Sequence, residues 1–251
     1  MKEQEVSLKM AEIFLKTAEK DLGASRHLWE GKFYPQAVFY LQQSVEKALK
    51  YLLLWTGIAG EDDVKKIGHK PQKLCIMIMT VAEKMRKDKF FGEILKGVFK
   101  DRGINFNRVM CKKIEEKELY SASLKSIDVI IDNHELKDER IKEWLESEQA
   151  QQIYLVLEKE FVKMLIEFGY SAQLLIYLFF VLAPHVTRSR YPVDDSDPLE
   201  IYNEGISLIQ KFESLLKICE YILNNLKNIK VYPMSDDIRK ILKSIRAETP
   251  K

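Results

Sequence analysis

The residue types best suited to bind a phosphate group occur together in one short segment. Arg190 is followed by Tyr191 and Pro192 and is preceded by His185 and Arg188. A proline disfavours the helical conformation in the residue before it, so Tyr191 is expected to be extended and the Arg190 side chain to project at the mouth of a helical bundle. These residues predict a phosphate-binding cluster.

The same segment allows a structural interpretation, which stays open. Arg190 could instead hold its loop through a carboxylate such as Asp194 or Asp195, with Tyr191 packed as a lid. The acidic residues could also suggest a divalent cation, because hard cations prefer oxygen ligands. Asp197 is better explained as the N-cap of a helix that begins with Pro198, so no metal site is predicted.

One histidine and four lysines are the remaining candidates for ligand binding. His69 precedes Lys70 at the end of a loop, where its imidazole could fix the loop through one hydrogen bond or contact a ligand. Lys47 and Lys50 are expected on the outer face of a helix, as part of an anion-binding groove or of a solvated face or dimer seam. The predicted ligand-binding residues are His69, Lys70, Lys73, Arg188, Arg190, Tyr191, Lys47 and Lys50.

No residue pattern indicates covalent, metal or cofactor chemistry. The three cysteines, Cys75, Cys111 and Cys219, are far apart and form no Cys-x-x-Cys pair, which argues against a disulfide framework and a structural zinc site. No Ser/His/Asp or Cys/His arrangement and no glycine-rich phosphate loop is found. We therefore predict no catalytic residue, no cofactor and a reducing, cytoplasmic location.

Composition indicates a globular chain whose charge is unevenly distributed. The 251 residues are 46% hydrophobic and 31% charged, and the net charge of +2 is too small for a protein that coats polyanions. Residues 64–113 carry 14 Lys or Arg against 4 Asp or Glu, whereas residues 114–149 carry 5 against 11. The two stretches could be solvated faces that offset each other, or the first could be a phosphate-binding surface.

Nearly every segment carries the helical period, and no strand pattern is sustained. Apolar residues at spacings of three and four predict helices at about 8–29 and 35–55, and a third helix that begins at Pro71. A loop is expected between Gly57 and Gly68. One long helix is predicted from Pro198 to about Leu226, and a shorter one follows at 236–245.

Residues 168–184 form the most apolar run of the chain. The run is shorter than the roughly 20 apolar residues that a membrane span needs, and Ser171 and Gln173 interrupt it. Lys163 and Glu167 stand just before it. A central buried helix is therefore predicted. The N-terminus shows no signal-peptide pattern, so no membrane association is expected.

Three stretches resemble the HEPN domain family. The opening helices resemble it at Asp21-Leu22-x-x-Ser25 and then at 31–50, which is GKFYPQAVFYLQQSVEKALK. Gly68-His69 is similar to the family's loop into the third helix, and Arg190-Tyr191-Pro192 is similar to its motif before the last long helix.

The resemblance implies an all-α, antiparallel up-and-down bundle of four to five helices with an inserted helical subdomain. The bundle would comprise residues 5–87 and 170–230, the insertion residues 88–169, and a C-terminal short helix and tail residues 231–251. It also implies a homodimer, a link to nucleotides or RNA, and in some members a nucleotidyltransferase partner.

Family members that cut RNA carry an Arg followed after four to six residues by a His, a pair able to move a proton and offset phosphate charge. None of His27, His69, His134 and His185 has an Arg at that spacing. We therefore expect a non-catalytic module that binds a nucleotide or RNA phosphate. The alternatives are a protein-interaction module that acts with a nucleotidyltransferase, and, disfavoured by the missing motif, a ribonuclease of the toxin–antitoxin type.

Overall fold

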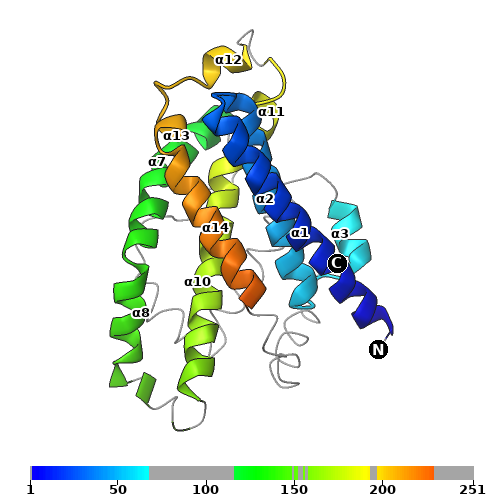
Figure 1. Ribbon diagram of the computed structural model, residues 1–251, viewed down its shortest axis with the longest axis vertical. Helices are drawn as coiled ribbons and strands as arrows, with labels where there is room; N and C mark the ends of the chain where they lie inside the picture. The colour runs from blue at the N-terminus through cyan, green and yellow to red at the C-terminus, as the bar shows by residue number, and fades with distance from the viewer. Residues whose placement is uncertain are drawn as a thin grey trace.

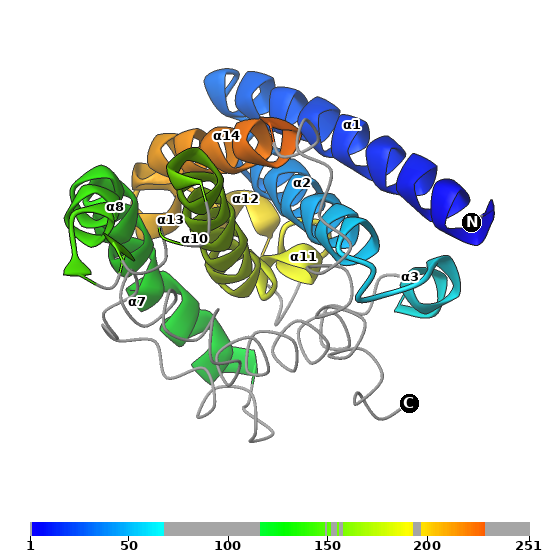
Figure 2. The ribbon, with the colours of Figure 1, turned by 90° about the horizontal axis from the view of Figure 1, so that it is seen from below.

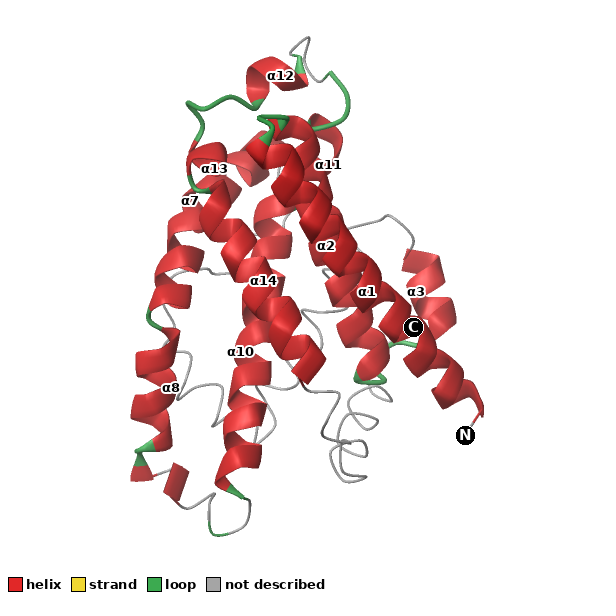
Figure 3. Ribbon diagram, viewed as in Figure 1, coloured by secondary structure: helices red, strands yellow, loops and turns green. Residues whose placement is uncertain are grey.

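The fold of the chain was obtained as a computed structural model, and it describes residues 2–67, 116–148, 150–151, 155, 158–192 and 197–228. These residues form helices and turns and no strand (Figure 3). The helices are α1 (Lys2–Glu30), α2 (Tyr34–Trp55), α3 (Glu61–Ile67), α7 (Glu116–Glu135), α8 (Lys137–Leu145), α10 (Lys159–Leu182), α11 (His185–Arg188), α12 (Pro198–Ile201), α13 (Ser207–Gln210) and α14 (Phe212–Asn228).

The long helices run alternately up and down the long axis of the molecule (Figure 1). α1 rises from the N-terminus and α2 descends beside it, while α7 and α8 descend along the opposite side. α10 then rises between these two pairs, and α14 descends next to it. From below, α10 lies between α14, α2 and α7 (Figure 2). The prediction of an all-α, up-and-down bundle is confirmed.

The corner between α1 and α2 follows directly from the sequence. α1 ends at Glu30, before Gly31, and Lys32 takes a left-handed backbone conformation with φ of 62°. Pro35 occupies the first turn of α2, where its missing N–H has no intrahelical acceptor to serve. Because the turn is short, the two helices pack along their lengths as an antiparallel pair.

The small residues of this pair bring the two backbones close together. Ala18 and Ser25 of α1 are fully buried, as are Ala37 and Ser44 of α2. The Ser44 hydroxyl donates to the Ala18 carbonyl at 2.7 Å, and the Ser25 hydroxyl donates to the Ala37 carbonyl at 2.8 Å. Such side-chain-to-backbone bonds between helices require close approach, which the small side chains at these positions allow.

The long helix predicted from Pro198 to Leu226 is wrong, because the chain leaves the helical path between Ile201 and Ser207. Asp197 caps α12 as predicted, accepting from the Leu199 amide at 2.8 Å. The Asn203 amide group then donates to the Glu200 carbonyl and accepts from the Gly205 amide, which closes a turn. Local side-chain bonds to the backbone compete with the helix at this point.

The loop predicted between Gly57 and Gly68 is also wrong in part, since α3 begins at Glu61. Gly57 does turn the chain, with φ of +70°. The Asp63 carboxylate accepts from the Gly60 amide at 2.9 Å and so caps the short helix. The third helix predicted from Pro71 and the short helix predicted at 236–245 lie outside the described residues.

α10 is the central helix that the apolar run predicted. Leu174, Leu175, Leu178 and Phe179 have at most 1% of their surface exposed. Within the described residues, Val162–Leu182 is the one stretch long and apolar enough to cross a membrane, and 53% of its most apolar part is buried in the fold. Core helices of globular proteins show the same length and composition.

α10 also connects the two parts that the sequence distinguished. It begins at Lys159 and continues without a break past residue 170, where the bundle was expected to resume. α7, α8 and α14 all pack against it. The described helices between residues 116 and 145 therefore share one core with the bundle.

Candidate functional site

Arg190 and Tyr191 lie at the end of the bundle where α11 follows α10 (Figure 1). After α11, the amides of Arg190 and Tyr191 both donate to the Thr187 carbonyl at 3.0 Å, which turns the chain back over α2. The Arg190 guanidinium carbon then lies 4.9 Å from the centre of the Phe39 ring of α2. The sequence did not indicate this partner, because the two residues are far apart in the chain.

Aromatic rings hold Arg190 on two sides. Its guanidinium carbon lies 5.1 Å from the centre of the Tyr191 ring, and one of its nitrogens donates to the Tyr191 hydroxyl at 3.0 Å. Within the described ranges, no carboxylate forms an ion pair with Arg190, and Asp194 and Asp195 lie outside those ranges. The Arg190 side chain is exposed, so its positive charge faces solvent.

The ring cluster extends along α2 to Tyr40. The Phe39 and Tyr40 rings meet edge to face with centres 5.4 Å apart. Tyr40 is 36% exposed and Tyr191 is 53% exposed. Tyr191 is thus half-exposed while its ring contacts Arg190, and its role as a lid stays a prediction. Sequence reasoning missed Phe39 and Tyr40, although two consecutive aromatic residues beside the predicted core stripe of a helix were the available signal.

His185 supports this turn from beneath and does not belong to the exposed cluster. It is fully buried, and its Nδ1 lies 2.9 Å from the Tyr202 hydroxyl oxygen. Burial, with a smaller effect of the Arg188 charge, lowers the pKa of His185 to about 3. Arg188 is half-buried next to this histidine. The predicted phosphate-binding cluster is thus reduced to Arg190 and Tyr191 at the surface.

The prediction that Lys47 and Lys50 lie on an outer face is wrong. Lys50 and Glu46 form an ion pair of 2.7 Å, and their side chains are only 9% and 6% exposed. Lys47 pairs with Asp21 of α1, and these side chains are 22% and 14% exposed. The reason is that α1, α10, α11 and α14 all pack around α2, so little of its circumference faces solvent.

The polar side chains of α2 satisfy one another inside the fold. The Gln42 amide group donates to the Glu46 carboxylate at 3.2 Å and accepts from Gln43 at 2.7 Å. Gln42 is fully buried. Buried polar groups are costly unless they are hydrogen-bonded. Lys47 and Lys50 therefore serve the structure of the bundle and are not open to a ligand.

The basic loop around residue 69 cannot be compared with the Arg190 cluster, because His69, Lys70 and Lys73 lie outside the described residues. The described part of that region is α3, which ends with the exposed Lys65 and Lys66. Lys65 forms an ion pair with Glu61 at 3.6 Å. The ligand-binding roles of His69, Lys70 and Lys73 stay predictions.

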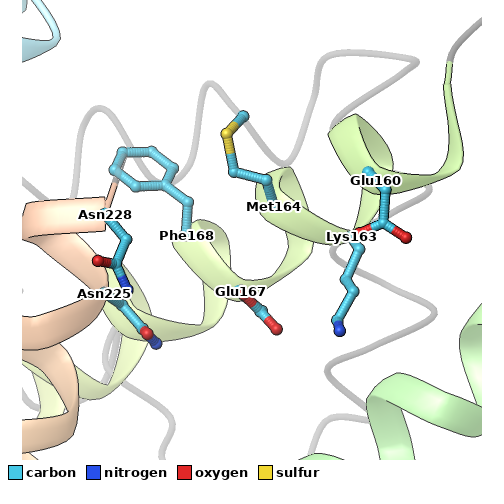
Figure 4. Close-up of a pocket in the computed structure, with 7 residues that line it drawn as sticks. All are labelled: Glu160, Lys163, Met164, Glu167, Phe168, Asn225 and Asn228. Atoms are coloured by element: carbon cyan, nitrogen blue, oxygen red, sulfur yellow. The ribbon is translucent and has the colours of Figure 1, made fainter. Parts of the chain in front are cut away.

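A pocket between α10 and α14 lies toward the opposite end of α10 from α11 (Figures 1 and 4). Its lining combines charged side chains of both signs, two carboxamides and two apolar side chains. The lining residues are Glu160, Lys163, Met164, Glu167, Phe168, Asn225 and Asn228. The two carboxylates disfavour an anion. The described residues contain no group of three or more potential metal ligands of the His, Cys, Asp or Glu type.

Comparison with known proteins identifies the part of the chain that forms α1, α2 and α3. The profile of the HEPN domain family matches residues 11–88. The curated protein "Putative toxin MJ1304" of Methanocaldococcus jannaschii is 40% identical over 58 residues, which are 23% of this chain. The chain spans 38% of the length of that relative. No solved structure matches the chain.

The match to the HEPN domain family agrees with the observed fold, because both indicate a helical bundle. The matched segment contains the close-packed pair of α1 and α2, including Phe39 and Tyr40, whereas Arg190 and Tyr191 lie beyond it. The exposed cluster is thus built from the matched segment and from a turn supplied by a later part of the chain. The similarity to the HEPN domain family therefore covers residues 11–88 and does not extend to Arg190.

Proposed function

We propose that the chain binds the phosphate groups of RNA or of a nucleotide without cleaving them, and that Arg190 makes the main contact. The observation that carries the proposal is the state of the Arg190 side chain. It is exposed, and the Phe39 and Tyr191 rings orient it at 4.9 and 5.1 Å. A guanidinium group held in this way can donate two parallel hydrogen bonds to a phosphate with little loss of side-chain freedom.

The chemistry of the nearby histidine supports binding over cleavage. A general acid or base near neutral pH needs a pKa close to the working pH. His185 is fully buried and its pKa is lowered to about 3. A group that is neutral and enclosed holds the turn in place and does not exchange protons with a phosphodiester.

Titration of labelled RNA and of nucleotides into the full chain tests this proposal. Binding should be measurable at about 50 mM salt and much weaker at about 200 mM, because phosphate contacts release counterions. Arg190→Ala should weaken it about tenfold or more, since a charge-assisted hydrogen bond contributes roughly 1.5–3 kcal/mol. Arg190→Lys should restore only part of the affinity, because an ammonium lacks the planar fork.

Arg26 provides the matched control for this charge change. It is a partly exposed arginine of α1 that pairs with Glu220 of α14 at 2.8 Å. Arg26→Ala should change RNA affinity by less than about twofold, as expected for an exposed ion pair. Equal losses in the two variants, or no binding by the wild type at low salt, would show that Arg190 is not a phosphate site.

A second candidate function is docking of a protein, either a second copy of the chain or a nucleotidyltransferase. Phe33, in the corner between α1 and α2, is 56% exposed, and Leu199 of α12 is 64% exposed. Both lie at the same end of the bundle as Arg190 (Figure 1). Exposed apolar side chains that gather at one place mark interaction surfaces. Leu199→Asp should lower the mass measured by light scattering if this end forms a homodimer.

The relative from Methanocaldococcus jannaschii is named "Putative toxin MJ1304". A ribonuclease of the toxin–antitoxin type is therefore the alternative to be tested. The shared segment is 58 residues long. Incubation of wild-type protein with RNA, with and without magnesium, distinguishes the two possibilities. A non-catalytic module leaves the RNA intact, whereas specific products that persist after careful purification would contradict the proposal.

A further inference from the structure

We propose that the end of the bundle at Arg190 binds an unpaired nucleic-acid strand by stacking its bases along a row formed by Tyr40, Phe39, Arg190 and Tyr191. The inference rests on the proposed binding function and specifies the form of the ligand. In this inference the bases of the strand are recognised by the aromatic rings, and its phosphates by the positive charge of Arg190. We call these four residues the stacking row.

The stacking row is continuous. The Tyr40 and Phe39 rings are 5.4 Å apart between centres, the Arg190 guanidinium lies 4.9 Å from the Phe39 ring, and the Tyr191 ring lies 5.1 Å from the guanidinium. Three of its four members are exposed to solvent, and Phe39 is partly buried between its neighbours. Aromatic rings and guanidinium planes are the groups on which unpaired bases stack.

The length of the stacking row favours a strand over a mononucleotide. Successive stacked bases are about 3.4 Å apart, so neighbouring members of the row are separated by more than one base step. A single base can cover one or two members and leaves the others exposed. Several bases of one strand can use the row fully, with a phosphate between them near Arg190.

The stacking row disfavours a duplex for a geometric reason. Base faces inside a double helix are already stacked on each other and present only their edges in the grooves. Tyr40 and Tyr191 would have nothing to stack on along an intact duplex. Only the phosphate contact of Arg190 would remain, and this contact is common to both forms of nucleic acid.

The support beneath the row fixes it before a ligand arrives. Phe39 and Tyr40 lie on α2, and the buried His185 and Tyr202 anchor the turn that carries Arg190. Further along the chain, Glu204 accepts hydrogen bonds from Lys32 and Tyr34, which ties the segment after α12 to the corner before α2. Because the helix and the anchored turn position Tyr40 and Tyr191 before binding, their side chains lose little conformational freedom when a ligand binds, and less affinity is lost.

A set of ligands of equal strand length tests the proposal on the wild-type chain, and the duplexes carry about twice the phosphates of the single strands, so phosphate contacts alone would favour them. The probes are a labelled RNA strand of about ten nucleotides, the DNA strand of the same sequence, each strand annealed to its complement, and a strand of the same length made of abasic units. Both single strands should bind at least about tenfold more tightly than the duplexes and the abasic strand. Tighter binding of the RNA strand than of the DNA strand would identify RNA as the ligand.

Variants of the two tyrosines give a second measurement. Tyr40→Leu and Tyr191→Leu keep an apolar side chain and remove the ring, and each should weaken single-strand binding about tenfold. Phe33→Leu is the matched control, because Phe33 is an exposed aromatic at the same end that contacts no ring of the row. It should leave affinity unchanged. Unchanged thermal midpoints would show that the variants remain folded.

The outcomes separate this inference from the proposed function. If duplex, abasic and single strands bind equally and Arg190→Ala weakens all of them, the stacking row is wrong and phosphate binding stands. If single strands are preferred but both tyrosine variants bind like wild type, the row is also wrong. If no probe binds at low salt, both proposals fail, and the apolar residues at this end then belong to a protein interface.

Discussion

Replacement of Lys50 by Met should lower the free energy of unfolding by about 3 kcal/mol, because the buried Glu46 carboxylate then loses its ammonium partner. Lys50 and Glu46 are 2.7 Å apart, with side chains only 9% and 6% exposed. Methionine preserves most of the side-chain volume, so the loss reports the charge. Lys50 also lies 5.8 Å from the Phe14 ring, a contact worth about 0.5–2 kcal/mol that Met keeps only as packing.

The chain contains a matched pair that differs mainly in burial. Glu213 and Lys217 of α14 have the same residue types, the same order and the same spacing of four, with a distance of 2.8 Å. Their side chains are 56% and 63% exposed. An exposed pair of this kind contributes roughly 0.3–0.5 kcal/mol. Lys217→Met should therefore cost about one tenth of what Lys50→Met costs.

Denaturant and thermal unfolding of the two variants measure the difference. A loss of about 3 kcal/mol should lower Tm by roughly 6–12 °C in a chain of this size, whereas Lys217→Met should shift it by about 1 °C. The double variant Glu46→Gln with Lys50→Met should recover much of the loss, since no unpaired buried charge remains. Equal effects of Lys50→Met and Lys217→Met would refute the reasoning, because burial would then make no difference to the pair.

Two further predictions follow from the buried titratable groups. Burial lowers the pKa of folded His185 to about 3 from its usual 6.5, so between these values only the unfolded chain gains the proton. Acidification below pH 6.5 should then reduce the free energy of unfolding by up to about 1.4 kcal/mol per pH unit, and His185→Gln should lose that part of the slope. An unchanged slope would contradict the burial of the imidazole. Burial also raises the pKa of the Cys219 thiol to about 12. Peptide mapping after iodoacetamide treatment at pH 8 should show Cys219 modified at least about 1000-fold more slowly in the native than in the unfolded chain, and comparable rates would place the thiol at the surface.

Local signals in the sequence predicted the corners of the bundle well. The predicted helices at about 8–29 and 35–55 agree with where α1 ends and α2 begins, beside Gly31 and Pro35, and Asp197 predicted the cap of α12. Each of these signals acts through the backbone of its own neighbours, so no distant contact is needed to interpret it. The apolar run that forms α10 was predicted for the same reason.

The long helix predicted from Pro198 failed where both local and distant side-chain hydrogen bonds compete with the apolar periodicity. The spacing of apolar residues continues through Tyr202 and Ile206, but the Asn203 side chain closes a turn there and Glu204 bonds to Lys32 and Tyr34. A periodic pattern indicates which side of a helix is apolar. It does not indicate that a bond to another part of the chain will interrupt the helix.

The candidate site shows the same limit. The sequence singled out Arg190 and Tyr191, but the ring that holds the guanidinium, Phe39, belongs to a helix near the other end of the chain. Lys47 and Lys50 were expected in solvent because charged residues usually occupy the outer face of a helix. Packing around α2 gave them buried acidic partners instead.

The sequence by itself determined that this chain is helical and where its corners form, because these properties depend on residue type and on near neighbours. Tertiary structure alone decided which charged residues are buried and which rings surround Arg190. Burial and ring contacts depend on how many helices pack around a given one, and that number is set by segments far apart in the chain.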